Sequence, residues 1–199
     1  MRTSAPRHLA AALLAIALLP ALAACGPEST TASFDPAAPC PAEGQMAGAY
    51  PNLEALVPVE YQGRAPDSVD SGRICSTEAL GTLADAGIAE VRYAGATWRT
   101  GGTAGLTQAV FEADGLDPAE MLDFYAVPAE SARRTEKLER STTMVGSLPA
   151  ERLDVLGSDG TGQTVVTWQV PGEAVVRVLL AADIGDAAVA DLLETLGGS

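Results

Sequence analysis

The stretch that decides the fold is residues 163–181, with the sequence QTVVTWQVPGEAVVRVLLA. In its first run every second side chain falls on one face of an extended chain: Thr164, Val166, Trp168 and Val170. Pro171-Gly172 supplies a turn, and the second run, 173–181, is apolar on both faces, as a central strand would be. Together with residues 150–156 and the turn at Ser158-Asp159-Gly160, this pattern predicts three successive antiparallel strands.

Two helix signals accompany these strands. After the last strand, Asp186 is expected to cap a helix whose apolar residues share one face: Val189, Leu192, Leu193 and Leu196. Asp117-Pro118-Ala119-Glu120 predicts an earlier helix that runs to about Tyr125. Asp117 can accept hydrogen bonds from free backbone N–H groups, Pro118 suits the first helical position, and Glu120 can bond back.

The middle of the chain predicts a further helix and a hairpin. Ser76 can cap a helix over residues 77–86, which Gly87 would end. Strands are expected at about 89–99 and 105–114. The glycine-rich loop between them joins strand to strand and leads to no helix, so it does not predict a phosphate-binding loop.

Other segments give weaker signals. Residues 52–57 suggest a short helix or turn, followed by irregular chain that could include a brief strand. Residues 130–140, with the sequence ESARRTEKLER, mix both charges and predict a solvated, salt-bridged face or connector. The whole pattern predicts an α+β fold in which a mostly antiparallel sheet of five to seven strands is packed by two or three helices.

A weak internal repeat is also present. Residues 111–114 followed by Asp117 align with residues 180–183 followed by Asp186, an offset of 69 residues. Two β-hairpin-plus-helix units could therefore pair into one sheet covered by helices on one face. The alternative is that any junction from strand to helix attracts an aspartate cap.

The first 25 residues have a different character. Arg2, Arg7 and His8 precede an apolar run, 9–19, that is too short for a membrane-spanning helix of about 20 residues. The segment closes on Leu22-Ala23-Ala24-Cys25, which resembles the lipobox of bacterial lipoproteins. The resemblance implies a signal peptide over 1–24 and fatty acyl chains such as palmitate on Cys25, which hold the protein at a membrane.

An organisation for the rest of the chain follows from this resemblance. Residues 25–48, rich in Pro, Ser, Thr and Ala, are expected to be a lipid-anchored flexible tether, and residues 49–199 a single domain. The protein would be exported and anchored to the outer face of the cell membrane, or to the outer membrane in a Gram-negative source. With Cys25 acylated in an oxidising compartment, Cys40 and Cys75 are expected to form one disulfide, since they lack the Cys-x-x-Cys spacing of a reactive pair.

Charge and composition exclude several classes of function. The first 24 residues include two arginines and no acidic residue, so the remaining chain keeps ten basic and all 26 acidic side chains, a formal balance of −16. Phosphate backbones are repelled by such a surface, so no nucleic acid is expected as a partner. Cationic ligands or metal ions would be attracted, although the charge can equally serve solubility alone.

The mature chain contains no histidine, because His8 lies in the signal segment, and Lys137 is its only lysine. Ser-His and Cys-His nucleophile pairs and imidazole zinc sites are therefore excluded. The aspartate pairs 114/117 and 183/186 could bind calcium, but helix capping explains Asp117 and Asp186 without a metal. Asp154 and Asp159 are interpreted as turn residues, and no metal or cofactor is expected.

Three functions remain open. The favoured one is a non-catalytic, membrane-anchored binding or accessory module for a protein partner or other ligand. The second is a carrier of an apolar small molecule or lipid, with the apolar faces of residues 163–182 lining a cavity rather than filling a core. The third is a carboxylate-dependent hydrolase, for which Trp98 and Trp168 could stack on sugars, although both lie in expected strands where a core role is the default.

Overall fold

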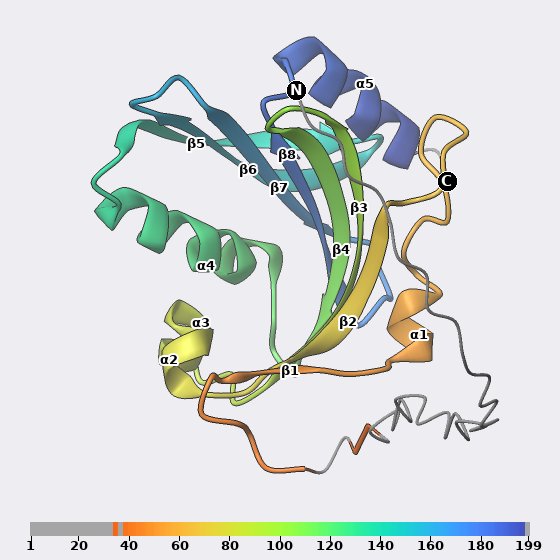
Figure 1. The fold of residues 1–199 in the computed structure, drawn as a ribbon, viewed down its shortest axis with the longest axis vertical. Helices are drawn as coiled ribbons and strands as arrows, with labels where there is room; N and C mark the ends of the chain where they lie inside the picture. The colour runs from red at the N-terminus through yellow and green to blue at the C-terminus, as the bar shows by residue number, and fades with distance from the viewer. Residues whose placement is uncertain (1–33, 36–37, 198–199) are drawn as a thin grey trace, which may run out of the picture. The chain divides into compact units, whose positions relative to one another are not determined.

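The computed structural model describes residues 34–35 and 38–197. The signal segment 1–24 and Cys25 lie outside these residues. Within the described chain eight strands form one sheet (Figure 1). In chain order they are β1 (Gln45–Ala47), β2 (Ser68–Ile74), β3 (Val91–Gly101), β4 (Ala104–Glu112), β5 (Thr135–Val145), β6 (Leu148–Gly157), β7 (Gly162–Gln169) and β8 (Val175–Ala182).

The strands lie side by side in the order β1-β2-β3-β4-β8-β7-β6-β5, and every neighbouring pair is antiparallel. Strands β1 to β4 and strands β5 to β8 form two half-sheets, which the pairing of β4 with β8 joins. The antiparallel α+β class is confirmed, but the prediction of five to seven strands is wrong. The fold is dominated by its sheet.

The two strands that the sequence did not predict are the edges of the sheet. β1 lies within the range 25–48 that was assigned to the tether, and it pairs with β2 through only three residues. β5 includes charged residues of 130–140, which were interpreted as a solvated, salt-bridged face or connector; they are exposed and ion-paired as in the first alternative, but they form a strand. An edge strand buries little side-chain surface, so neither segment shows the apolar alternation by which inner strands are recognised.

Within the same described residues five helices accompany the sheet, where two or three were expected: α1 (Pro51–Glu54), α2 (Thr77–Leu80), α3 (Thr82–Asp85), α4 (Pro118–Ser131) and α5 (Asp186–Gly197). The cap at Ser76 is confirmed, because its Oγ accepts from the Ala79 N–H at 3.2 Å. The helix predicted over 77–86 is broken in two at Gly81, whose φ of 53° and ψ of −122° are not helical.

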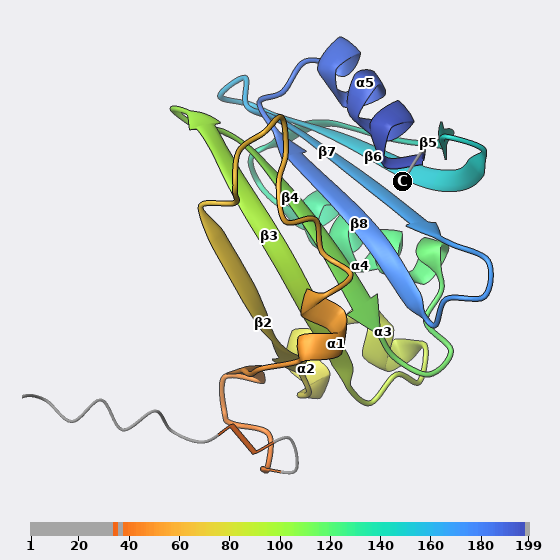
Figure 2. The ribbon, with the colours of Figure 1, turned by 90° about the vertical axis from the view of Figure 1, so that its right-hand side faces the viewer.

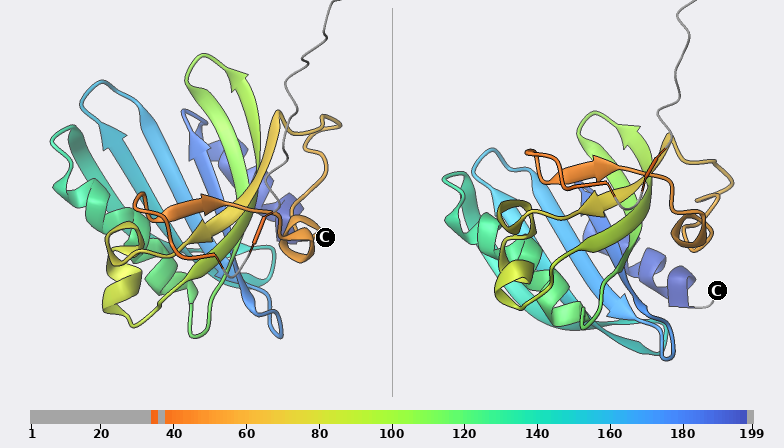
Figure 3. Two further views of the ribbon diagram at one scale, coloured as in Figure 1. Left: turned by 60° about the horizontal axis from the view of Figure 1, so that its bottom comes forward. Right: turned by 90° about the horizontal axis from the view of Figure 1, so that it is seen from below.

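The helices lie on both faces of the twisted sheet (Figures 2 and 3). α1 and α5 cover one face, where Leu179 and Trp98 belong to the buried core. α2, α3 and α4 cover the other, where Val176 and Val178 are buried. The prediction of apolar residues on both faces of the last strand is therefore confirmed. Each buried Val or Leu side chain contributes about 1.5–3 kcal/mol relative to exposure.

The opposite placement of α4 and α5 bears on the internal repeat. β3, β4 and α4 form one hairpin-plus-helix unit, and β7, β8 and α5 form the other. Equivalent strand residues keep equivalent faces, since Phe111 and Leu180 both pack on the α4 side. The chain then turns to opposite faces, at Gly115 (φ 79°) in one unit and at Asp183 (φ 51°) in the other. The expectation of helices on one face only is wrong.

α4 begins as the sequence predicts and ends later. The Asp117 carboxylate accepts from the Glu120 N–H at 2.9 Å, which confirms the cap. Glu120 does not make the predicted return bond in the described chain, and its buried Oε2 has no hydrogen-bond partner there. The helix passes Tyr125 and continues through Pro128 to Ser131. Its start is held to the sheet by Thr167, whose buried hydroxyl donates to the Pro118 carbonyl at 2.7 Å.

The disulfide between Cys40 and Cys75 is confirmed, with Cα atoms 5.8 Å apart and a sequence separation of 35. Cys75 follows β2 directly, and its N–H donates to the Gly44 carbonyl at 2.9 Å. The bridge thus fastens the three-residue strand β1 to the sheet edge, where its few backbone hydrogen bonds alone would give a marginal pairing.

Replacing Cys40 and Cys75 together with serine is expected to lower the free energy of unfolding by about 3–4 kcal/mol. The reason is that the unfolded chain gains the freedom that a closed loop of this length removes. Urea unfolding of the two proteins under identical conditions measures the difference. A loss below about 1 kcal/mol would contradict a stabilising role of this bridge.

Candidate functional site

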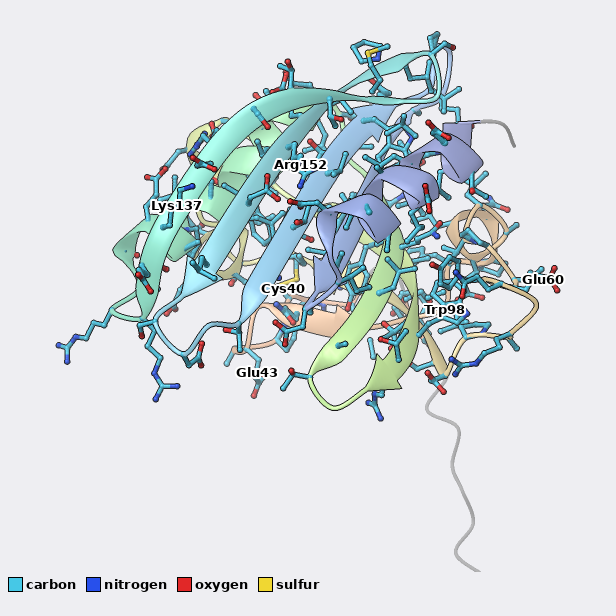
Figure 4. All side chains as sticks on the ribbon, turned by 90° about the horizontal axis from the view of Figure 1, so that it is seen from above. Cys40, Glu43, Glu60, Trp98, Lys137 and Arg152 are labelled. Atoms are coloured by element: carbon cyan, nitrogen blue, oxygen red, sulfur yellow. A yellow bond between two sulfur atoms is a disulfide. The ribbon has the colours of Figure 1, made fainter. Side chains whose placement is uncertain are left out.

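The candidate site is a hollow of about 360 Å³ beside the start of α5, on the face of the sheet that α5 covers. Strand alternation brings its polar residues together, because Lys137 and Glu139 on β5, Arg152 and Asp154 on β6, and Thr164 on β7 all face this side. Figure 4 shows Lys137 and Arg152 on neighbouring strands near α5. Ile184, Gly185 and Asp186 close the hollow from the segment that leads into the helix.

Arg152 is the centre of the site. Its Nε donates to Asp154 Oδ2 at 2.7 Å, and its Nη2 donates to Asp154 Oδ1 at 2.8 Å, which makes a two-point contact. The same Nη2 donates to Asp186 Oδ1 at 2.9 Å. The Thr164 hydroxyl completes the network by donating to Asp154 Oδ1 at 2.7 Å. Only 18% of the Arg152 side chain is exposed, so the contact is partly shielded from water.

The network fixes the ionisation of its members. Burial favours the neutral form of Asp154, but the hydrogen bonds from Arg152 and Thr164 outweigh it and hold the pKa of Asp154 below its ordinary value. The bond to Asp154 likewise raises the pKa of Arg152, although burial opposes the shift. A carboxylate with a lowered pKa and two donors on it is a weak proton acceptor at neutral pH. The cluster is suited to holding structure rather than to general acid–base work.

Asp186 does not cap α5 as predicted. The N-cap position belongs to Gly185, whose carbonyl accepts from the Val189 N–H at 3.1 Å, and Asp186 is the first residue of the helix. Its carboxylate reaches Arg152 instead. At the other end of the helix, Gly197 packs against Gly146 in the β5–β6 turn, where an added Cβ on Gly146 would lie 2.7 Å from the Gly197 Cα. Helix α5 is therefore fixed to the sheet at both ends.

The rim of the hollow carries an exposed ion pair. Lys137 Nζ lies 2.9 Å from Glu139 Oε1, and 60% of each side chain is exposed. A pair in that setting contributes less than about 1 kcal/mol to stability. It leaves both charges accessible to a molecule that approaches the edge of the sheet.

A second hollow, of about 540 Å³, lies where β3 and β4 meet the loops at one end of the sheet. Its charged lining consists of Glu90, Arg92, Glu112 and Asp114. Glu90 joins two arginines, since its carboxylate accepts from Arg73 at 2.9 Å and from Arg92 at 3.2 Å. Arg92 Nη1 also lies 3.9 Å from Glu112 Oε2, so three of the four charged residues of the lining belong to one ion-pair network.

Three further aspartates that the sequence singled out have structural partners: Asp154, Asp159 and Asp183. Asp159 is a turn residue as predicted, because its Oδ1 accepts from the Thr161 N–H and hydroxyl at 3.1 and 2.6 Å. Asp154 is not a turn residue but a strand residue of the Arg152 network, and that prediction is wrong. Asp183 Oδ1 accepts from the Gly162 N–H at 2.8 Å, and its Oδ2 accepts from the Thr103 hydroxyl, which joins three loops.

No group of three or more metal-ligating His, Cys, Asp or Glu side chains occurs within residues 34–35 and 38–197. In the same residues no helix is long and apolar enough to cross a membrane. Trp98 and Trp168 are buried in the core, as predicted for strand residues, and Trp98 Nε1 donates to the Arg64 carbonyl at 3.0 Å.

The chain matches no protein-family model, no curated protein and no solved structure in the comparisons made. Of the three predicted cysteine sites, Cys40 and Cys75 are joined and lie apart from the Arg152 hollow, whose lining does not include them. Cys25 lies outside the described residues. The sequence missed the Arg152 network, although Arg152 and Asp154 stand two residues apart on a predicted strand and so share a face.

Replacing Arg152 with methionine is expected to lower the free energy of unfolding by about 1–3 kcal/mol near neutral pH, because the ionised Asp154 keeps only the Thr164 hydroxyl as a hydrogen-bond donor. The pKa of folded Asp154 lies below the ordinary 3.8, so its stabilisation is present above about pH 4 and is lost as the pH falls through the folded pKa. The difference in the free energy of unfolding between wild type and variant should therefore become smaller below about pH 4.

Denaturant unfolding across this pH range measures the difference. The exposed Arg133 provides the control, and its replacement by methionine should change stability by less than about 0.5 kcal/mol. If the loss of unfolding free energy in Arg152→Met stayed constant from about pH 3 to 7, Arg152 would not be what lowers the pKa of Asp154.

Proposed function

We propose that this chain is an exported lipoprotein whose folded domain acts as a non-catalytic binding or accessory module on the outer face of a membrane. The observation that carries the proposal is Cys25 at the end of Leu22-Ala23-Ala24-Cys25, after a short basic and then apolar segment. The disulfide between Cys40 and Cys75 is consistent with an oxidising compartment, since such bridges are rare in the cytosol.

The non-catalytic role is supported by the side chains that the domain has available for catalysis. The mature chain has no histidine, and its single lysine forms an ion pair with Glu139. In the Arg152 hollow, Asp154 and Asp186 accept hydrogen bonds from Arg152, and Asp154 also accepts one from Thr164. The pKa of Asp154 is lowered, whereas a general acid needs a raised one. A carboxylate-dependent hydrolase therefore has weaker support here than a binding role.

A protein partner has more support than an apolar small molecule. The large apolar side chains of residues 163–182 pack into the two cores and line neither the Arg152 hollow nor the second hollow. A carrier would need those side chains to face an open cavity. Extraction of the natively purified protein with organic solvent distinguishes the two roles, because a stoichiometric lipid in the extract would favour the carrier.

Replacing Cys25 with serine is expected to abolish incorporation of a labelled fatty acid and to move the protein out of the membrane fraction. Both effects follow because the sulfur that would carry the acyl chains is gone. Metabolic labelling followed by membrane fractionation measures them. Replacing Cys40 with serine is the matched control and should leave labelling intact. Unchanged labelling or membrane attachment of the Cys25 variant would refute the anchor.

Cross-linking in the native cell tests the binding role itself. The expected product joins the membrane-attached wild-type chain to a defined protein, and its yield should fall for the Cys25→Ser variant. Turnover of a generic chromogenic glycoside that is lost on one carboxylate substitution would instead establish the hydrolase.

A further inference from the structure

The two edges of the sheet differ in how they are protected. On one side the short strand β1 is tied down by the disulfide that follows β2. On the other side β5 runs for 11 residues, pairs with β6 alone among the described strands, and is mostly exposed. Every second residue of an edge strand directs its backbone N–H and C=O away from the sheet, where another strand can bind them. β5 is therefore the open edge of this domain.

The order of charges along β5 restricts what can pair with it. Its exposed positions include Glu136, Lys137, Glu139 and Arg140, around the half-buried Leu138. Charges on an edge normally discourage pairing, and Glu136 also forms a bulge between Thr135 and Lys137. These charges repel a strand of unmatched pattern and accept one whose charges are complementary.

The sequence of β5 is complementary to itself when reversed. In an antiparallel pair with the two-fold axis at Leu138, Lys137 lies opposite Glu139 of the second copy, and Glu139 opposite Lys137. These two Lys137–Glu139 contacts are the attractive cross-strand pairs of the register. Arg140 falls opposite Glu136 but is already bonded to Asp123 and Glu130 of α4 in its own copy, so the register does not depend on it. If the axis lay at residue 137 or 139 instead, Lys137 or Glu139 would lie opposite the same residue of the second copy, and the two like charges would repel each other.

From this register we infer that β5 is a homodimerisation edge, at which the sheets of two copies join into one continuous antiparallel sheet through residues 135–141. Leu138 lies at the centre and contacts its equivalent on the face that α4 covers. The strong net negative charge of the domain opposes approach at long range. At physiological ionic strength that repulsion is screened beyond about 8 Å, whereas the cross-strand pairs act at contact.

Site-specific cross-linking of the full chain in its native membrane tests the register. Leu138→Cys should give a dimer with a short bismaleimide, because opposed Cβ atoms in such a pair lie about 4.5–5.5 Å apart. Ser141→Cys is the matched control on the same strand, since its two copies would be about 20 Å apart. The chain without an added cysteine gives the background. Cross-linking of Ser141→Cys but not Leu138→Cys, or of neither, would overturn the proposal.

A charge exchange provides an independent test. Lys137→Glu and Glu139→Lys should each reduce the dimer fraction at least several-fold in native mass spectrometry of the full chain, because each puts like charges opposite one another. The double exchange should restore it. All three variants should unfold like the wild type, because both side chains are exposed. A monomeric wild type, or single variants that dimerise as well as the wild type, would contradict this interface.

Discussion

The pairing of β4 with β8 is the constraint on which the rest of the structure depends. Residues 105–112 pair with 175–182 across a long stretch of chain, and this ladder joins the half-sheet of β1 to β4 to the half-sheet of β5 to β8. Both strands bury side chains on both faces, so each core spans the junction. Pairing β4 with β8 costs chain entropy, because the ends of the long intervening segment must be brought together. The free energy gained by burying apolar surface has to be larger than this cost.

Local patterns explain which parts of the fold could be predicted. The strands β6, β7 and β8 alternate or are wholly apolar, and their turns contain Asp-Gly or Pro-Gly, so a short window of sequence is sufficient. β5 could not be found in this way, because its outward charges reflect an edge position that is defined by a distant strand order. The faces taken by α4 and α5 were likewise unpredictable, since a strand that is apolar on both sides does not indicate which helix covers which side.

The candidate site illustrates the same limit. Arg152, Asp154 and Thr164 could in principle be grouped from strand alternation and hairpin register, but Asp186 joins them only because α5 folds back over this face. The sequence pattern predicted that Asp186 caps α5, but Gly185 takes the N-cap position instead. The sequence predicted the helix correctly and misassigned the side chain, because the partner of Asp186 lies 34 residues earlier in the chain.

The bridge between Cys40 and Cys75 has a mechanical consequence. Residues 41–74, which include β1, α1 and β2, lie within a covalently closed ring. A pulling force applied to the chain before Cys40 passes through the two sulfur atoms to Cys75, and the ring itself is bypassed. When the chain is pulled from its amino-terminal side, the load would thus reach the end of β2 and the segment that follows it, while β1 is spared from being peeled away.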